Sequence, residues 1–116
     1  MISAAAVMCM ALTIYHEARG EPLAGQAAVG YVLYRRADFD QDLVCHETYR
    51  RNQFEWTKNP KKVTMQQLEP YVILSAKILN HEIRDGSRGA EFFHNINMPN
   101  PWGMKPKITI NNHVFY

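Results

Sequence analysis

The chain has little cysteine, no long apolar run and no segment dominated by one charge. Its two cysteines, Cys9 and Cys45, are too few for a disulfide framework and lack the spacing of a zinc site. We therefore expect two buried free thiols, which fits folding in a reducing compartment. The net charge is only +2, and no Lys/Arg-rich run is interleaved with aromatic residues, so the sequence does not indicate nucleic-acid binding.

The N-terminal segment from Met1 to Ile14 is almost wholly apolar. It is too short to span a bilayer, and no Lys or Arg precedes the apolar run as in a signal peptide. We therefore interpret this segment as the first core helix, with a cleaved signal peptide as the alternative, and expect no stable membrane insertion. Synthesis in the cytoplasm without a signal peptide is the expected consequence, with export by a separate route or release by cell lysis.

The length of 116 residues and the hydrophobic content of 47% predict one soluble globular domain spanning residues 1–116. Ser3 is a candidate N-cap for a first helix, in which apolar residues recur at three-to-four spacing. Gly20 and Pro22 are expected to end that helix. A second helix is predicted from about Leu23 to Arg36, with small residues that allow another helix to approach closely.

Two further helices are predicted in the middle of the chain. Asp42 is a candidate cap for a short helix that runs to Tyr49. An irregular aromatic loop is expected at residues 52–60. Thr64-Met65-Gln66-Gln67 has the pattern of a capping box, and the longest helical pattern follows it and ends at Asp85-Gly86. Pro70 is expected in the first turn of that helix or at its true start.

The residues after Gly89 favour strands rather than helices. Aromatic and β-branched side chains recur there, and Asn111-Asn112 is a good hairpin turn. The sequence therefore predicts a mainly α, α+β domain of about four helices, followed by a small C-terminal antiparallel sheet.

Glu17 is the side chain that most clearly indicates chemistry. It is predicted to lie in the last turn of an apolar helix, where burial and the negative end of the helix dipole both disfavour its charged form. Glycosidases use such a protonated carboxyl to donate a proton to a leaving sugar oxygen. The alternative, on residue chemistry alone, is a surface glutamate at a helix end.

Several short motifs follow one another along the whole chain. They are Tyr15-His16-Glu17-Ala18-Arg19-Gly20-Glu21-Pro22, Gly25-Gln26, Ala28-Val29, Arg36, Gln53-Phe54, Trp56-Thr57, Gly89-Ala90, Phe93-His94, Pro101-Trp102, Ile110, His113 and Phe115-Tyr116. This order resembles the SleB-type cell-wall hydrolases, which include spore cortex-lytic enzymes and phage lysins. Arg35 departs from the family pattern, in which asparagine is usual, and Glu55 replaces a small hydroxyl residue.

The resemblance implies a lysozyme-like fold and cleavage of peptidoglycan between N-acetylmuramic acid and N-acetylglucosamine. It also implies that Glu17 is the catalytic acid of a lytic transglycosylase, which leaves 1,6-anhydro ends and consumes neither water nor a cofactor. The expected partner is therefore the glycan strand of the cell wall, and the protein is expected to be a monomer. The expected place of action is the cell wall of a phage-infected host at lysis, the periplasm or the spore cortex.

Two other carboxylates keep a hydrolytic muramidase open as the alternative. Glu21 lies four residues after Glu17 and could raise its proton affinity, orient substrate, or cap the next helix. Glu55 could act as base or nucleophile, and so convert the reaction to hydrolysis, if it faces Glu17 across a cleft.

Further candidates for substrate binding are aromatic or polar side chains. Those that could stack on sugar faces, or equally belong to the core, are Phe54, Trp56 and Trp102. Those that could hydrogen-bond an acetamido group or the catalytic acid are Gln53 and Tyr15. Those that could line the cleft or tie the sheet together are His94 and His113.

Neither a metal site nor a cofactor is predicted. His16 is not followed by a second histidine four residues later, so the helix motif of zinc proteases is absent. His94 and His113 have no obvious third partner. A zinc amidase or peptidase, which EDTA would inhibit, and a non-catalytic peptidoglycan-binding module are the alternatives from other functional classes.

Overall fold

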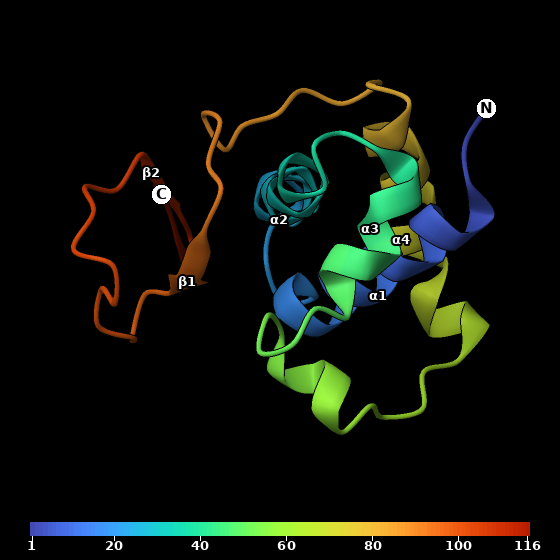
Figure 1. The fold of residues 1–116 in the computed structure, drawn as a ribbon, viewed down its shortest axis with the longest axis horizontal. Helices are drawn as coiled ribbons and strands as arrows, with labels where there is room; N and C mark the ends of the chain where they lie inside the picture. Colours follow the sequence, from blue (N-terminus) through green and yellow to red (C-terminus); the bar gives the residue numbers. More distant parts are fainter.

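The computed structural model describes residues 1–116 and confirms the predicted fold class (Figure 1). The helices are α1 (Ala4–Ala18), α2 (Leu23–Arg36), α3 (Gln41–Thr48) and α4 (Met65–Leu79), with a 3-10 helix η1 (Glu55–Lys58) between α3 and α4. The strands are β1 (Phe93–Asn95), β2 (Ile108–Ile110) and β3 (His113–Phe115), which form an antiparallel sheet in the order β1-β3-β2. No helix combines the length and the apolar character needed to cross a membrane.

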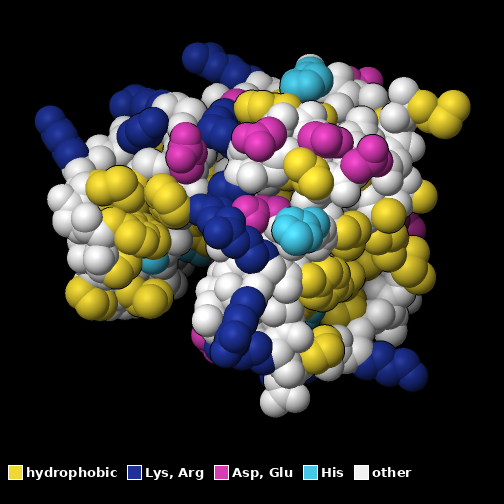
Figure 2. Space-filling view, in the orientation of Figure 1, with side chains coloured by type: hydrophobic (Ala, Val, Ile, Leu, Met, Phe, Trp, Pro, Cys, Tyr) yellow, Lys and Arg dark blue, Asp and Glu magenta, His cyan; other side chains and the backbone are white.

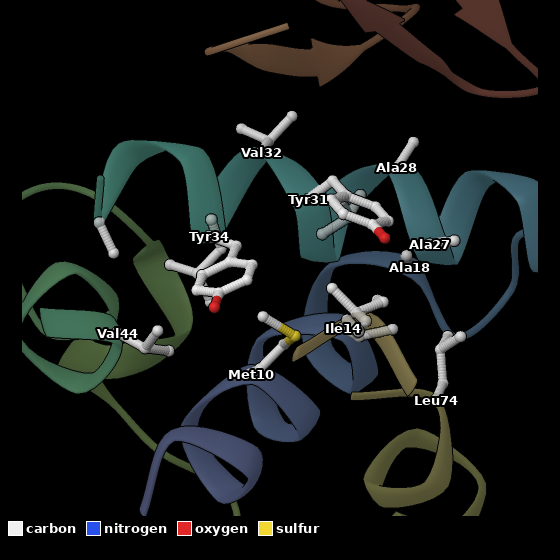
Figure 3. Packing of buried hydrophobic residues seen from close by; sticks show 14 of the residues in the cluster. Met10, Ile14, Ala18, Ala27, Ala28, Tyr31, Val32, Tyr34, Val44 and Leu74 are labelled. Carbon is white, nitrogen blue, oxygen red and sulfur yellow. The ribbon is translucent and has the colours of Figure 1, made fainter. Parts of the chain in front are cut away.

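Helix α1 is central and packs against α2, α3 and α4. Its start is set by Ser3, the predicted N-cap, whose hydroxyl accepts the backbone N–H of Ala6 at 3.2 Å. Met10 and Ile14 are fully buried and lie opposite α2 in Figure 3. The first apolar segment is therefore a core helix, as its periodicity predicts.

Helix α2 approaches its neighbours most closely at Gly30. A Cβ at this position would lie 2.6 Å from Cδ1 of Ile78 on α4 and 3.1 Å from Cδ1 of Ile14 on α1. Both distances are shorter than ordinary van der Waals contact, so only glycine fits without a shift of the neighbours. The predicted role of the small residues in α2 is confirmed at this position.

The expectation of two free thiols is wrong, because Cys9 of α1 and Cys45 of α3 form a disulfide with their Cα atoms 5.3 Å apart. The packing of α1 against α3 brings the two backbones within bridging range. The separation of 36 residues hides this contact in the sequence. The disulfide removes the reason to expect a reducing compartment, since disulfides persist where conditions are oxidising.

Helix α3 begins two residues earlier than a cap at Asp42 would place it. The N-cap is Asp40, whose carboxylate accepts the backbone N–H of Asp42 at 2.9 Å. Asp40 has the extended backbone of an N-cap, and its side chain satisfies a donor that the first turn leaves free. The predicted cap residue is therefore the residue that is capped.

Helix α4 begins at the predicted capping box, in which Thr64 and Gln67 exchange hydrogen bonds. Pro70 lies inside the helix rather than in its first turn, because the box fixes the start at Met65. The helix ends at Leu79, before the predicted Asp85-Gly86. His81 has a positive φ of 58°, which no α-helix accommodates.

The segment of residues 80–92, called here the connector, carries the chain from α4 to the sheet. Arg35 at the end of α2 holds it, through an ion pair with Asp85 and a hydrogen bond of 2.8 Å to the carbonyl of Ala90. The sheet lies to one side of the helical body, and α2 faces it (Figure 1). The predicted Asn111-Asn112 turn joins β2 to the central strand β3.

Reduction of the Cys9–Cys45 disulfide is expected to lower the free energy of unfolding by about 4 kcal/mol, the chain-entropy estimate for a loop of this length. Urea unfolding with and without dithiothreitol measures the difference. A Cys9→Ala/Cys45→Ala variant is the control, since its unfolding should not respond to the reductant. An unchanged midpoint for the native chain in dithiothreitol would contradict the disulfide.

Gly30→Ala is expected to lower the free energy of unfolding by about 1–3 kcal/mol, because the added methyl group overpacks the contact with Ile78. Gly20→Ala is the matched control, since a Cβ at Gly20 meets nothing within 4 Å. Thermal unfolding of both variants checks the prediction, and equal effects at the two positions would argue against a close approach at Gly30.

Candidate active site

Glu17 lies in the last turn of α1, where the helix leaves the core. Ala18 beside it is 2% exposed, whereas Arg19 and Gly20 are exposed. The Glu17 side chain is partly buried, and burial raises the pKa of its carboxyl to about 7. Near neutral pH this carboxyl is therefore present in both its protonated and its ionised form.

Two cavities meet at Glu17, and both are lined by Glu17, Phe93 and Trp102. The first cavity has a volume of about 260 Å³ and the second about 340 Å³. Together they form the cleft. Figure 2 shows the surface hollowed between the part of the molecule that carries the sheet and the helical body. A polymer lying in the cleft would pass the Glu17 carboxyl near its middle.

The first cavity is lined by both polar and aromatic side chains. Besides the shared residues it is lined by Val32, Arg36, Asn52, Gln53, Phe54, Glu91 and Phe92. Arg36 donates from Nη2 to Oε1 of Gln53 at 3.1 Å and from Nη1 to the carbonyl of Glu91 at 3.2 Å. Its guanidinium also lies over the Phe92 ring, 4.9 Å from the centroid.

The second cavity is lined mainly by imidazoles and the loop that follows β1. Besides the shared residues, its lining consists of His16, His94, Asn95, Met98, Pro101 and His113. His94 is buried and held on both ring nitrogens, with Nε2 at 2.7 Å from the Tyr116 hydroxyl and Nδ1 at 2.7 Å from the Asn95 carbonyl. Burial lowers the pKa of His113, with Glu21 opposing that shift.

Glu21 does not line the cleft. Its carboxylate accepts hydrogen bonds from the backbone N–H of Asn112 and from Nδ2 of Asn111, both at 3.0 Å. One carboxylate oxygen lies 3.6 Å from Nδ1 of His113. Although burial alone would raise the pKa of Glu21, these hydrogen bonds and His113 lower it. Glu21 therefore joins the α1–α2 junction to the β2–β3 turn, and it makes no contribution to the raised pKa of Glu17.

Three other predicted site residues lie outside both cavities. The Glu55 side chain is 87% exposed and pairs with Lys58 on η1. Trp56 stacks on His16 with ring centroids 4.4 Å apart, and Tyr15 packs edge-on against Tyr71 at 5.7 Å. Trp56 and Tyr15 therefore support the helix that carries Glu17, and Glu55 faces solvent.

Six of the predicted residues are brought together in the cleft: Glu17, Gln53, Phe54, His94, Trp102 and His113. Phe54 is also core, at 6% exposure. Residue-type reasoning missed Arg36, Asn52, Glu91 and Phe92. Arg36 belongs to the ordered motifs, and that signal could have identified it as a site residue. Glu91 lies in the connector, and no sequence pattern surrounds it.

The structure brings no three His, Cys, Asp or Glu side chains into an arrangement that would hold a metal ion. The imidazoles of the second cavity are instead engaged with Tyr116, Trp56 and Phe93. The chemical groups that the cleft offers are thus one carboxyl with a raised pKa, amide and guanidinium donors, and aromatic rings.

Residues 20–116 match the Cell Wall Hydrolase family, and the chain belongs to that family. Membership makes it a peptidoglycan-degrading enzyme. The match begins at Gly20, three residues after Glu17, so the assignment of Glu17 depends on the geometry of the cleft. No curated protein and no solved structure matched the chain, and the lysozyme-like relationship stays a prediction.

Glu17→Gln is expected to stabilise the protein at pH 8 but not at pH 4. The folded state holds the Glu17 proton up to about pH 7 and the unfolded state only to about pH 4.5, so ionisation costs folding free energy that is absent below pH 4.5 and complete above pH 7. The difference amounts to about 3 kcal/mol. Urea unfolding of both proteins across this pH range measures it, and a pH-independent difference would contradict the buried carboxyl.

Proposed function

We propose that this protein is a peptidoglycan lytic transglycosylase in which Glu17 is the only catalytic acid and base. The observation that carries the proposal is the position of the Glu17 carboxyl. Its pKa is raised to about 7, and it lies where two cavities meet. A group that donates a proton and then takes one back works best when its pKa is near the working pH.

The glycan strand would lie along the cleft with the scissile bond at Glu17. Trp102, 39% exposed, has its ring centroid 5.2 Å from that of Phe92, and this pair offers an apolar surface for a pyranose face. Because Trp102 and Phe93 line both cavities, sugars on either side of the scissile bond would meet the same aromatic wall.

The reaction needs one carboxyl in two states. Protonated Glu17 donates its proton to the glycosidic oxygen as the bond from that oxygen to C1 of the muramic acid breaks. The C6 hydroxyl of the same sugar then forms a bond to C1 and loses its proton to the Glu17 carboxylate. The products are a 1,6-anhydro end and a free hydroxyl on the leaving sugar, and Glu17 is protonated again. General acid–base help of this kind contributes about 10²–10⁴-fold to the rate.

A hydrolytic muramidase is the second candidate, because Glu91 lines the first cavity together with Glu17. Hydrolysis needs a second carboxylate to activate water or to attack C1. Glu55 and Glu21 are engaged elsewhere, with Lys58 and with the β2–β3 turn. Glu91 is therefore the residue through which a hydrolytic reaction would proceed.

Glu17→Gln is expected to lower the release of soluble fragments from purified peptidoglycan by at least about 100-fold, because glutamine cannot donate or take the proton. Mass spectrometry of the fragments is the measurement. Muramic acid ends lighter by one water, carrying the 1,6-anhydro ring, are expected from the native protein. Activity should fall as pH rises through about 7, since the protonated carboxyl starts the reaction.

Glu91→Gln serves as the comparison variant. It should keep the 1,6-anhydro products of the native protein. Reducing muramic acid ends that disappear in Glu91→Gln would instead establish the hydrolytic reaction. Release of stem peptides, with inhibition by EDTA, would mean that the bond cleaved is an amide and that the role given to Glu17 is wrong.

A further inference from the structure

Arg36 dictates which end of the Gln53 amide is left free to bind a ligand. An arginine side chain has five N–H donors and no acceptor, so the atom of Gln53 that lies 3.1 Å from Arg36 Nη2 has to be the carbonyl oxygen Oε1. The Nε2 group then points away from Arg36. It makes no hydrogen bond within the protein, and Gln53 lines the first cavity. The free hydrogen-bonding group of this lining residue is therefore a donor and not an acceptor.

The turn before Gln53 fixes the backbone from which this side chain extends. The backbone N–H of Gln53 donates to the carbonyl of Arg50 at 3.0 Å, and Asn52 has a positive φ of 64°. Asparagine tolerates the left-handed conformation better than most residues. Arg36 is itself fixed from three directions: by Gln53, by the Glu91 carbonyl, and by the Glu47 carboxylate, which lies 3.6 Å from its Nε. Little freedom is left for the amide to turn.

The charges around the first cavity disfavour an anionic ligand group. The Arg36 charge is already paired with Glu47, whose side chain is only 6% exposed. Glu17 and Glu91 both line the same cavity. A carboxylate entering it would meet two carboxyl groups and no unpaired cation, whereas a neutral carbonyl oxygen would accept the Gln53 N–H without that repulsion.

We propose that Gln53, positioned by Arg36, binds the carbonyl oxygen of an acetamido group on the sugar in the first cavity, and so makes the enzyme selective for N-acetylated glycan. This inference rests on the proposed function, since it assumes that a glycan occupies the cleft. Gln53 is the residue that contacts the substrate, and Arg36 is a positioning residue. The carbonyl oxygen of the acetamido group is the hydrogen-bond acceptor, and removal of the acetyl group leaves an ammonium group, which cannot accept a hydrogen bond.

The test compares the binding of N-acetylated glycan strands with that of the same strands after chemical de-N-acetylation. Both are titrated against Glu17→Gln, which binds without cleaving, and the tryptophan fluorescence is followed because Trp102 lines the cleft. Adding Gln53→Glu is expected to weaken binding of the N-acetylated strand about 10-fold. Binding of the de-N-acetylated strand should be unchanged or tighter, because the new carboxylate faces an ammonium group.

Gln66→Glu is the matched control for charge, since Gln66 is exposed on α4 and lies outside both cavities. It should affect the two strands equally and slightly. Gln53→Met removes the donor without adding charge, and it should also weaken binding of the N-acetylated strand alone. Arg36→Lys lets the amide turn and should reduce the preference between strands while both still bind.

Equal weakening of both strands by Gln53→Glu and Gln53→Met, with unchanged thermal unfolding, would overturn the role of Gln53. No change for either strand would overturn it as well. If Glu17→Gln binds neither strand and the native protein releases no glycan fragments, the proposed function itself fails. If the native protein cleaves glycan and the preference is insensitive to Gln53, this inference alone is wrong.

Discussion

The central position of α1 is the constraint on which the site depends. The helix is enclosed by α2, α3 and α4, bridged to α3 through the Cys9–Cys45 disulfide, and met at close range by Gly30 of α2. Its last turn cannot move outward without breaking this packing, so the Glu17 carboxyl stays partly out of water. Because no cation compensates for that burial, the carboxyl holds its proton to about pH 7. The chemistry of the site thus follows from the packing of the core.

The width of the cleft depends on how the sheet is attached to the helical body. Two polar contacts at different places set that attachment. At one, Arg36 reaches from α2 to the carbonyl of Glu91, just before β1. At the other, Glu21 receives the N–H of Asn112 in the β2–β3 turn. One contact starts from Arg36 at the end of α2, and the other from Glu21, which lies in the turn between α1 and α2, four residues after Glu17. The distance between the Glu17 carboxyl and the aromatic side chains of Phe93 and Trp102 is therefore set by polar contacts, while the apolar core positions the carboxyl.

Local chemistry made much of the fold predictable. The cap at Ser3, the capping box at Thr64 and the Asn111-Asn112 turn each depend on residues within four positions of one another, and each is confirmed. The burial of Glu17 was likewise readable from its place at the end of an apolar helix. Contacts between distant residues were not readable. The disulfide spans 36 residues, and the Arg35–Asp85 pair that holds the connector after the early end of α4 spans 50. Arg36 and Glu91, which both line the first cavity, are joined by a further contact of this kind across 55 positions.

The use of a neutral amide at the cleft is consistent with the demands on Glu17. An unpaired arginine near this carboxyl would favour the ionised form and lower the pKa that the acid step needs. Arg36 lines the same cavity, but its charge is paired with Glu47, and in the proposed binding mode it would act on the substrate through the Gln53 amide. Binding of an N-acetylated sugar can then be selective without loss of the proton. If an unpaired cation bound the substrate, it would raise the affinity for the substrate but lower the pKa of Glu17. A neutral amide donor can bind the substrate without lowering that pKa.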